Sequence, residues 1–380
     1  MNNPIKIKNI FADHWDDFIL KGFTIRPVVF KNVAKIINCG DPSMGHALYF
    51  CDHCEKFKYV SFTCKSRFCN SCGAKYIQDR AASISSKLIR CKHRHIVFTI
   101  PESLRNYFLY DRSLLDIIFK ASKDTILKWF YSLNKSEDFK PGFVSTLHTF
   151  GRDLKWNPHI HMILTEGASG TKTPWRKVSF IPFNMLRKRW QATLLSMLHK
   201  YLGSSFYSVK SSLFKSYPKG FYVYAKPNMS SKSLDTIKYI VRYTGRPAMA
   251  QSRILSYDGQ FVTFYYDRHE DNKRVVEKVH AIEFIKRLII HIPNEEFKMI
   301  RYYGLYAKKY KYSSSLYLLE SKELRHFRKK HAHWRARLIL AFGIDPLRCL
   351  CGHTMDLVKI VHPGKNIFLD NLPSQFYNSS

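Results

Sequence analysis

The sequence predicts an α+β protein organised around one large domain, and three observations lead to this prediction. Between residues 86 and 300, segments with the alternating pattern of β-strands are interspersed with segments whose apolar residues recur three and four positions apart, as in helices. A cysteine-rich stretch at 36–80 precedes this region, and a basic, aromatic stretch at 301–380 follows it. Residues 1–35 contain a short amphipathic piece, so we expect four regions along the chain.

Individual elements of the large domain have clear patterns. These patterns predict strands at 93–101, 142–150, 159–165 and 220–227, and helices at 113–133, 183–202 and 233–247. The second and third strands are expected to be neighbours, because only a short polar turn joins them. Asp258 and Gly259 predict the turn of a β-hairpin over 254–267.

The chain is strongly basic. It has 62 Lys and Arg against 29 Asp and Glu, and the resulting net charge of +33 is spread along its length. Such a field suits a polyanion, for which nucleic acid is the default candidate and an anionic membrane surface is the alternative. No run of about 18 apolar residues and no apolar signal-peptide core is present, so we expect a cytoplasmic protein without membrane insertion. In that reducing setting, the nine cysteines favour metal binding over disulfides.

Two pairs of cysteines have the spacing of a zinc ribbon. Cys51 and Cys54 form the first pair, and Cys69 and Cys72 form the second pair fourteen residues later. Each Cys-x2-Cys turn brings two thiolates within reach of one ion, and two such turns complete a tetrahedral site. The sequence therefore predicts one structural Zn(II) site with these four ligands.

Other residues near the two pairs have open assignments. Cys39 and Cys64 could each replace one of the four ligands or could simply be buried, which is the commoner fate of a spare cysteine. Lys65 and Arg67 could contact phosphates of a nucleic acid or could form a solvated basic face.

A weaker cysteine cluster lies near the C-terminal end. Cys349, Cys351 and His353 stand close together, but a single residue between two cysteines is unusual for a zinc knuckle. A second metal site there is one interpretation, and free side chains are the other.

Two histidines are separated by one residue in the predicted strand at 159–165. His159 and His161 therefore point to the same face of the sheet, because side chains alternate along a strand. They could be core histidines bonded to backbone carbonyls, or two ligands of a divalent metal ion. A metal site needs a third ligand, which His148 on the preceding strand could supply through hairpin pairing. Asp153 and Glu166 are weaker candidates.

Two tyrosines lie four positions apart on the predicted helix at 233–247. Tyr239 and Tyr243 share one face of this helix, which Gly245 and Pro247 are expected to end. On their own, stacked tyrosines of this kind are usually packing residues. The nearby histidines, the zinc ribbon and the basic charge favour a chemical role instead.

Together these motifs resemble those of the two-tyrosine HUH transposases of the insertion sequence 91 family. The resemblance covers most of the chain and runs through the stretches 49–76, 94–105, 147–167, 239–254 and 283–307. Its specific part is the combination of His-hydrophobic-His with Tyr-x3-Tyr on a downstream helix. The chain departs from the family at Asn157, where a histidine is expected, and in the Cys-x-Cys spacing near its C-terminal end.

The resemblance implies a fold and a chemistry. It implies a mainly antiparallel catalytic sheet carrying the histidines, with the tyrosine helix packed across its face. His159 and His161 would hold Mg(II) or Mn(II), and Tyr239 and Tyr243 would be nucleophiles that nick and rejoin single-stranded DNA at the ends of a mobile element. A 5′-phosphotyrosine intermediate would conserve the phosphodiester energy. The zinc ribbon would grip element-end DNA.

Several points stay open at the level of sequence. Arg242 and Arg246 could steady the scissile phosphate or face solvent. The same nicking chemistry would serve a replication initiator or a conjugative relaxase, and two further alternatives are a non-catalytic zinc-ribbon DNA-binding protein and a hydrolytic nuclease. The stretch "GASGTKT" lacks the order of a Walker A loop, so strand separation would come from host helicase or replication proteins.

Overall fold

The computed structural model describes residues 6–224, 247–268, 271–308, 316–330, 333–343, 345–363 and 365–368. In these ranges the protein combines helices with three β-sheets, and every strand pair is antiparallel. The predicted α+β class with a mainly antiparallel sheet is therefore confirmed. The predicted helix at 233–247, with both tyrosines, lies outside the described residues except for its last position.

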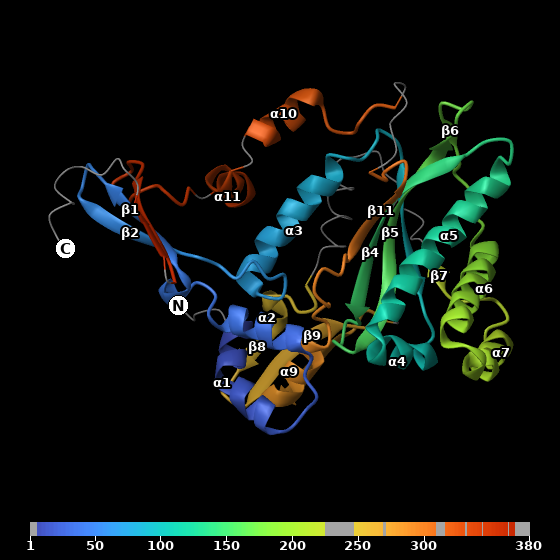
Figure 1. The fold of residues 1–380 in the computed structure, drawn as a ribbon, viewed down its shortest axis with the longest axis horizontal. Coiled ribbons are helices and arrows are strands. Elements are labelled where there is room, and N and C mark those ends of the chain that lie inside the picture. The colour runs from blue at the N-terminus through green and yellow to red at the C-terminus, as the bar shows by residue number, and fades with distance from the viewer. Residues whose placement is uncertain are drawn as a thin grey trace.

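The central sheet has the strand order β11-β4-β5-β3-β7, and β6 also pairs with β5 (Figure 1). Its strands are β3 (His93–Thr99), β4 (Lys140–Phe150), β5 (Trp156–Ser169), β6 (Arg176–Lys177), β7 (Val223–Tyr224) and β11 (Ile300–Gly304). The four predicted strands at 93–101, 142–150, 159–165 and 220–227 thus all belong to one sheet. The longest two, β4 and β5, form its centre as a hairpin.

Helices cover one face of this sheet and build the largest core. They are α4 (Glu102–Tyr110), α5 (Leu115–Leu133), α6 (Phe183–Leu202) and α7 (Tyr207–Ser216). Because side chains alternate along strands, Ile160 and Met162 of β5 point into this core. Trp190 of α6 is fully buried there, and its indole N–H donates to the carbonyl of Thr99 at 2.8 Å. The helices at 113–133 and 183–202 were both predicted from their apolar periodicity.

The opposite face of the sheet carries the histidines and receives one long helix. This helix, α3 (Asn70–Ser85), packs with Ile84 against Val144 of β4 and Ile163 of β5. Figure 1 shows α3 on one side of the central sheet and α5 and α6 on the other.

A second, smaller unit packs at the β4–β5 turn. It contains α1 (Ile7–Leu20), α2 (Pro27–Ile37), the sheet β8 (Ile254–Tyr257), β9 (Phe261–Asp267) and β10 (Arg274–His280), and α9 (Ala281–Ile289). The pairing of β8 with β9 confirms the predicted hairpin, whose turn Asp258 stabilises by accepting from the backbone N–H groups of Gln260 and Phe261. Leu154, from the β4–β5 turn, is fully buried in the apolar core of this unit.

Two strands near the N-terminal end of the sequence and two near its C-terminal end form a third sheet, which we call the terminal sheet. Its strand order is β13-β12-β1-β2, with β1 (His46–Cys51), β2 (Lys56–Ser61), β12 (Asp356–His362) and β13 (Lys365–Phe368). The helices α10 (Lys322–Lys330) and α11 (Trp334–Phe342) lie between the central sheet and the terminal sheet along the chain (Figure 1). Short 3-10 turns lie at Pro42–Met44, Arg112–Leu114, Ser204–Phe206 and Gln251–Arg253. Among the described residues, no helix is both long and apolar enough to cross a bilayer.

One buried histidine links the central sheet to the smaller unit. His291 follows α9, and its Nε2–H donates to the carbonyl of Leu154 at 2.9 Å. Its Nδ1 lies 3.2 Å from the hydroxyl of Thr149 on β4, and its ring stacks on Trp156 of β5. Burial lowers the pKa of His291 to about 3 from an ordinary value of 6.5, because the charged imidazolium is poorly solvated there.

This histidine makes stability depend on pH. Above pH 6.5 it is neutral in both the folded and the unfolded state. Between pH 6.5 and about 3, the unfolded state binds a proton at this histidine that the folded state does not bind. The free energy of unfolding therefore decreases by roughly 1 kcal/mol for each unit by which the pH is lowered. We expect His291→Gln to cost about 1–2 kcal/mol at pH 7.5 through lost hydrogen bonding. Denaturant titrations should show a smaller difference in the free energy of unfolding between wild type and variant at pH 5.5, because only the wild type loses stability to proton binding. An equal difference at both pH values would contradict the assignment.

Candidate metal centres

The hairpin of β4 and β5 brings three histidines together on one face of the central sheet. In its register, His148 lies directly opposite His159, and Thr146 lies opposite His161. One ring nitrogen from each of His148, His159 and His161 lies within 4.8 Å of those of the other two. We call these residues the histidine group. Hairpin pairing supplies the third histidine, as the sequence suggested.

The geometry of this group fits a metal ion. The Nε2 atoms of His159 and His161 are 3.0 Å apart, which is the separation of two neighbouring ligands on an ion with bonds of about 2.1 Å. His159 donates from Nδ1 to the carbonyl of Asn157 at 2.7 Å, so its Nε2 keeps a lone pair. The side-chain oxygen of Asn157 is also buried and has no hydrogen-bond partner among the described residues.

Electrostatics keep the imidazoles of His159 and His161 neutral. Burial lowers the pKa of His159 to about 4, and burial together with the neighbouring histidines lowers the pKa of His161 well below its ordinary value. A neutral imidazole offers the lone pair that a metal ion requires. Arg105 of α4 adds positive charge near His159, which disfavours a proton there.

Sequence reasoning missed a fourth histidine. The Nε2 of His95 on β3 lies 2.9 Å from the Nδ1 of His161, and the two rings stack at 5.1 Å. When His161 donates from Nδ1 to His95, the lone pair of His161 lies on Nε2, where a metal ion could bind. Fixing the tautomer in this way is the usual role of an outer partner of a metal-binding histidine. The signal was present in the sequence as a second His-x-His, formed by His93 and His95. Nothing in the sequence pattern aligned it with His161.

The two carboxylates considered as alternative third ligands have other partners. Glu166 is buried and pairs with the guanidinium of Arg94 at 2.5 Å. Asp153 stabilises the β4–β5 turn by accepting from the backbone N–H of Lys155 at 3.1 Å. Neither belongs to the histidine group.

The structure corrects the predicted zinc site. Cys51, Cys54, Cys69 and Cys72 do not form one site, because the two pairs belong to different groups. Strand β2 separates them: six extended residues at about 3.3 Å each carry the chain roughly 20 Å away from the first pair. Eight of the nine described cysteines instead form two groups of four.

The first cysteine group consists of Cys39, Cys64, Cys69 and Cys72. Its Sγ–Sγ distances include 3.6 Å and 3.7 Å, close to the roughly 3.8 Å edges of a tetrahedron with Zn–S bonds of about 2.3 Å. Cys69 occupies the N-cap position of α3. The backbone N–H of Ser66 points at the Cys64 sulfur at 3.4 Å. Both spare cysteines considered from the sequence thus lie in this group.

The second cysteine group consists of Cys51, Cys54, Cys349 and Cys351. The Sγ atoms of Cys51 and Cys351 are 3.5 Å apart, and those of Cys54 and Cys349 are 3.4 Å apart. The weak C-terminal cluster of the sequence therefore meets the first Cys-x2-Cys pair.

The basic residues proposed for nucleic-acid contact differ in their surroundings. Lys65 is exposed and has a positive φ of 54°, while Arg67 is half-buried with its guanidinium over the rings of Phe68 and Tyr76. Arg242 and Arg246, like Tyr239 and Tyr243, lie outside the described residues. Arg67 is therefore held by aromatic packing, and Lys65 faces solvent.

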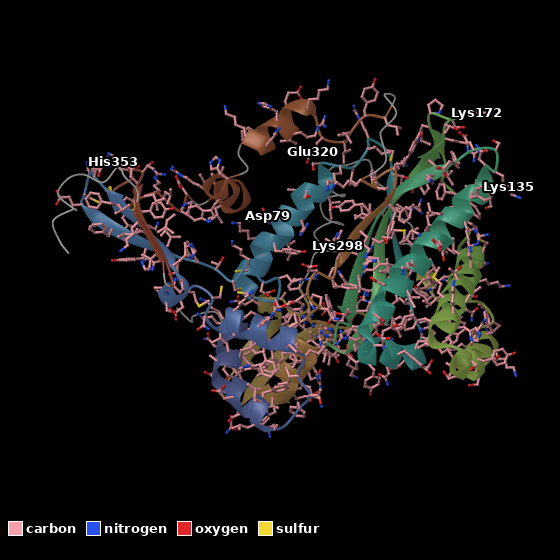
Figure 2. All side chains as sticks on the ribbon, viewed as in Figure 1. Asp79, Lys135, Lys172, Lys298, Glu320 and His353 are labelled. Atoms are coloured by element: carbon pink, nitrogen blue, oxygen red, sulfur yellow. The ribbon has the colours of Figure 1, made fainter. Side chains whose placement is uncertain are left out.

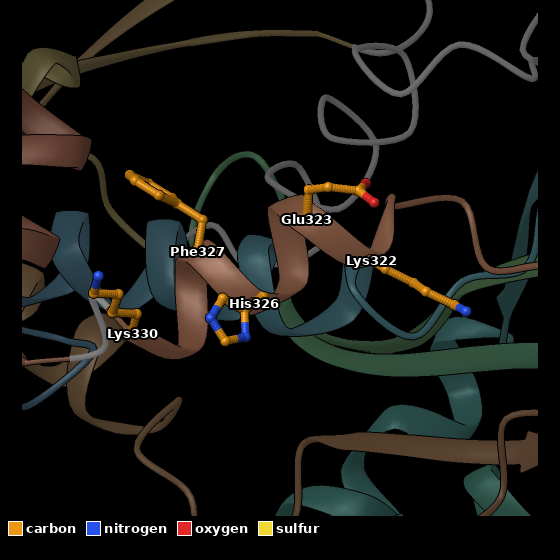
Figure 3. A pocket seen from close by; sticks show the side chains of 5 residues that line it. All are labelled: Lys322, Glu323, His326, Phe327 and Lys330. Carbon is orange, nitrogen blue, oxygen red and sulfur yellow. The ribbon is translucent and has the colours of Figure 1, made fainter.

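A pocket along α10 lies apart from all these groups. It is lined by Lys322, Glu323, His326, Phe327 and Lys330 (Figure 3). Because a single helix supplies every lining residue, we assign it no role.

Comparisons with known proteins agree with this arrangement. A family model described as "Putative transposase" matches residues 142–313, and one described as "Transposase zinc-binding domain" matches residues 10–100. The histidine group lies in the first match, and the first cysteine group lies in the second.

Two curated relatives align along most of the chain. The "Transposase for insertion sequence element IS801" of Pseudomonas savastanoi pv. phaseolicola is 28% identical over 375 residues, covering 93% of this chain and 89% of the relative. The "Putative transposase y4qJ" of Sinorhizobium fredii is 27% identical over 330 residues, covering 80% and 81%. No solved structure matches. These matches confirm the resemblance to the transposases of the insertion sequence 91 family that the sequence motifs indicated.

Proposed function

We propose that this transposase nicks and rejoins single-stranded DNA at element ends through a tyrosine, by a rolling-circle-type route. The observation that carries the proposal is the histidine group, His148, His159 and His161, on one face of the central sheet. The family match to residues 142–313 includes these histidines and the two tyrosines of the sequence motif. A packing role would not require three imidazoles with their ring nitrogens turned toward one point.

The proposed reaction exchanges one phosphodiester for another. The phenolic oxygen of Tyr239 or Tyr243 attacks the scissile phosphorus in line, and a P–O bond forms as the bond to the 3′-oxygen breaks. The 3′-oxygen takes up a proton, and the phenol loses one. A 5′-phosphotyrosine and a free 3′-hydroxyl result, so rejoining by the reverse reaction needs no ATP. Two tyrosines allow one to hold the first end while the other attacks a second phosphate.

The chain's own residues would prepare the phosphate for attack. A divalent ion such as Mg(II) or Mn(II) on the histidine group would supply Lewis-acid polarisation of the phosphate oxygens. The carbonyl of Asn157 holds His159 in the tautomer with its lone pair on Nε2, and a hydrogen bond donated by Nδ1 of His161 to His95 would do the same for His161. We assign phosphate contact to Arg105, whose buried Nε has no hydrogen-bond partner among the described residues, and to Arg242 and Arg246 of the sequence motif.

The described residue before the tyrosine segment supports this assignment. Tyr224 pairs with Val97 of β3, and Val97 pairs in turn with His161 of β5. Strand β7 thus lies two strands from the strand that carries His159 and His161, and Tyr239 follows Tyr224 by 15 residues in the sequence. A segment of 15 residues can span at most about 50 Å, which is long enough to bring Tyr239 to the histidine group.

A structural Zn(II) role completes the proposal. The zinc-binding family match contains Cys39, Cys64, Cys69 and Cys72, and we assign them as its ligands. The ion would fix α3, which lies against the histidine face of the sheet, and would position Lys65 and Arg67 for DNA contact. Host replication or helicase proteins would supply the single strands.

The nicking proposal predicts a covalent protein–DNA adduct. Full-length protein incubated with labelled single-stranded DNA from the element's ends should give a shifted band on a denaturing gel, dependent on Mg(II). Tyr239→Phe combined with Tyr243→Phe should abolish the band, because neither phenol can attack. Tyr110→Phe, which changes an exposed tyrosine of α4, is the matched control and should retain it.

The alternatives give different results in the same assay. A hydrolytic nuclease would cleave without an adduct and would survive loss of both phenols. A non-catalytic zinc-ribbon protein would bind the strands and leave them intact. A replication initiator or relaxase would form the adduct without joining two element ends. Cleavage without an adduct, or binding without cleavage, would overturn the tyrosine mechanism.

An aromatic pair beside the histidine group suits unpaired bases. Tyr222 and Tyr224 are 50% and 39% exposed, and their rings stack at 5.9 Å. Tyr224 lies on the histidine face through its pairing with Val97, and the guanidinium of Arg187 lies 5.3 Å from the Tyr222 ring. Exposed rings next to a cation can stack bases while the cation contacts phosphate.

This pair should contribute to single-strand binding. Replacing Tyr222 and Tyr224 together by Ala should weaken binding of a single-stranded oligonucleotide about 5- to 150-fold, because one base stacked on this pair contributes about 1–3 kcal/mol. Binding of a duplex of the same sequence should change little. Fluorescence anisotropy measures both, with Tyr110→Ala as the control. An equal loss for both DNA forms would argue against base stacking.

A further inference from the structure

The second cysteine group joins segments from opposite parts of the sequence. Its paired sulfurs, Cys51 with Cys351 and Cys54 with Cys349, are separated by 300 and 295 positions. The family match to a zinc-binding domain ends at residue 100, so it contains only half of this group. The second cysteine group is also distinct from the histidine group and from the first cysteine group, because it shares no residue with either.

Strand register explains why these cysteines meet. In the antiparallel pairing of β1 with β12, Phe50 lies opposite Asp356. The turn after β1 therefore lies beside the residues that precede β12. Cys51 ends β1 and Cys54 lies in the turn to β2, where the backbone N–H of Glu55 donates to the carbonyl of Cys51 at 2.8 Å. The terminal sheet thus holds two cysteine-bearing turns side by side.

The local backbone accommodates the unusual Cys-x-Cys spacing. Residues 349–352 form a tight turn in which the N–H of Gly352 donates to the carbonyl of Cys349 at 2.9 Å. Gly352 has a φ of +91°, which a residue with a side chain rarely adopts. Leu350 is 97% exposed, so it points to solvent while both flanking sulfurs face the first pair. One intervening residue is therefore enough here.

We propose that the second cysteine group is a second structural Zn(II) site, which ties the C-terminal segment to the N-terminal hairpin. Its four sulfurs lie within 4.8 Å of one another, and the two closest pairs lie at 3.4 and 3.5 Å, near the edges of a zinc–thiolate tetrahedron. All four cysteines are free thiols, with sulfurs well beyond the roughly 2.05 Å of a disulfide. The four thiols cluster beside Tyr49 and Met355, which shield the turn side of the group.

The site would also orient the helix that precedes it. Arg335 of α11 forms a two-pronged ion pair with Asp345, with N–O distances of 2.8 and 2.6 Å. Asp345 in turn accepts from the N–H of Leu347, and Leu347 packs in the core of the cysteine group. Zinc at the turn would hold β12 against β1 and, through this ion pair, α11 as well. Figure 2 shows His353, from the same turn, on the side of the terminal sheet.

Metal content tests the proposal directly. Full-length protein purified without chelators should contain about two zinc ions per chain when zinc is measured by inductively coupled plasma mass spectrometry. Cys349→Ser combined with Cys351→Ser should contain about one, and so should Cys51→Ser combined with Cys54→Ser. Cys91→Ser, which changes a cysteine outside both groups, should keep about two. His353→Ala should also keep about two, because four thiolates complete the site.

Hydrogen exchange tests the structural consequence in the same proteins. In the Cys349→Ser, Cys351→Ser variant, the amides of β12 that bond to β1 should exchange faster, while those of β4 and β5 stay protected. This internal comparison separates undocking of the C-terminal segment from global unfolding. One zinc per wild-type chain, or two that persist in both double-serine variants, would overturn the proposal. Oxidised Cys54–Cys349 and Cys51–Cys351 disulfides in freshly purified protein would overturn it as well.

Discussion

The register of the β4–β5 hairpin is the constraint on which the histidine site depends. It places His148 opposite His159 and lets His161 extend from the same face one pair further along. A shift of one residue would turn all the side chains of β5 to the other face, sending the histidines into the helix-covered core and Ile160 and Met162 to the opposite side. The buried partners of those two residues on α5 and α6 hold the register in place. The apolar core therefore specifies where the polar site lies.

The terminal sheet applies the same principle at a larger scale. Pairing of β1 with β12 brings together cysteines that lie almost three hundred positions apart, as the β4–β5 hairpin brings together histidines eleven positions apart. In both cases backbone hydrogen bonds set the positions, and the ligand side chains follow. The first cysteine group differs, because the loop after β2 and the start of α3 supply three of its four sulfurs.

The sequence predicted what depends on local periodicity and missed what depends on long-range contact. Alternation gave the strands and the shared face of His159 and His161, and the short turn gave the partnership with His148. Cysteine spacing alone suggested a ribbon of Cys51, Cys54, Cys69 and Cys72, since nothing local shows that β2 separates the pairs. The contact of His95 with His161 and the meeting of the Cys54 turn with Cys349 needed the order of strands in each sheet. Strand order is set by packing of the whole core.

We propose that the register of the β4–β5 hairpin assembles a site for a divalent ion with imidazole ligands. Pulsed electron paramagnetic resonance of Mn(II) added to the zinc-loaded protein tests it most directly. The account predicts nitrogen couplings from bound imidazoles, lost in the His159→Ala, His161→Ala variant, with Mn(II) affinity reduced about 10- to 100-fold in His95→Ala through loss of its hydrogen bond. Bound Mn(II) without nitrogen couplings, or couplings unchanged in the double variant, would contradict it.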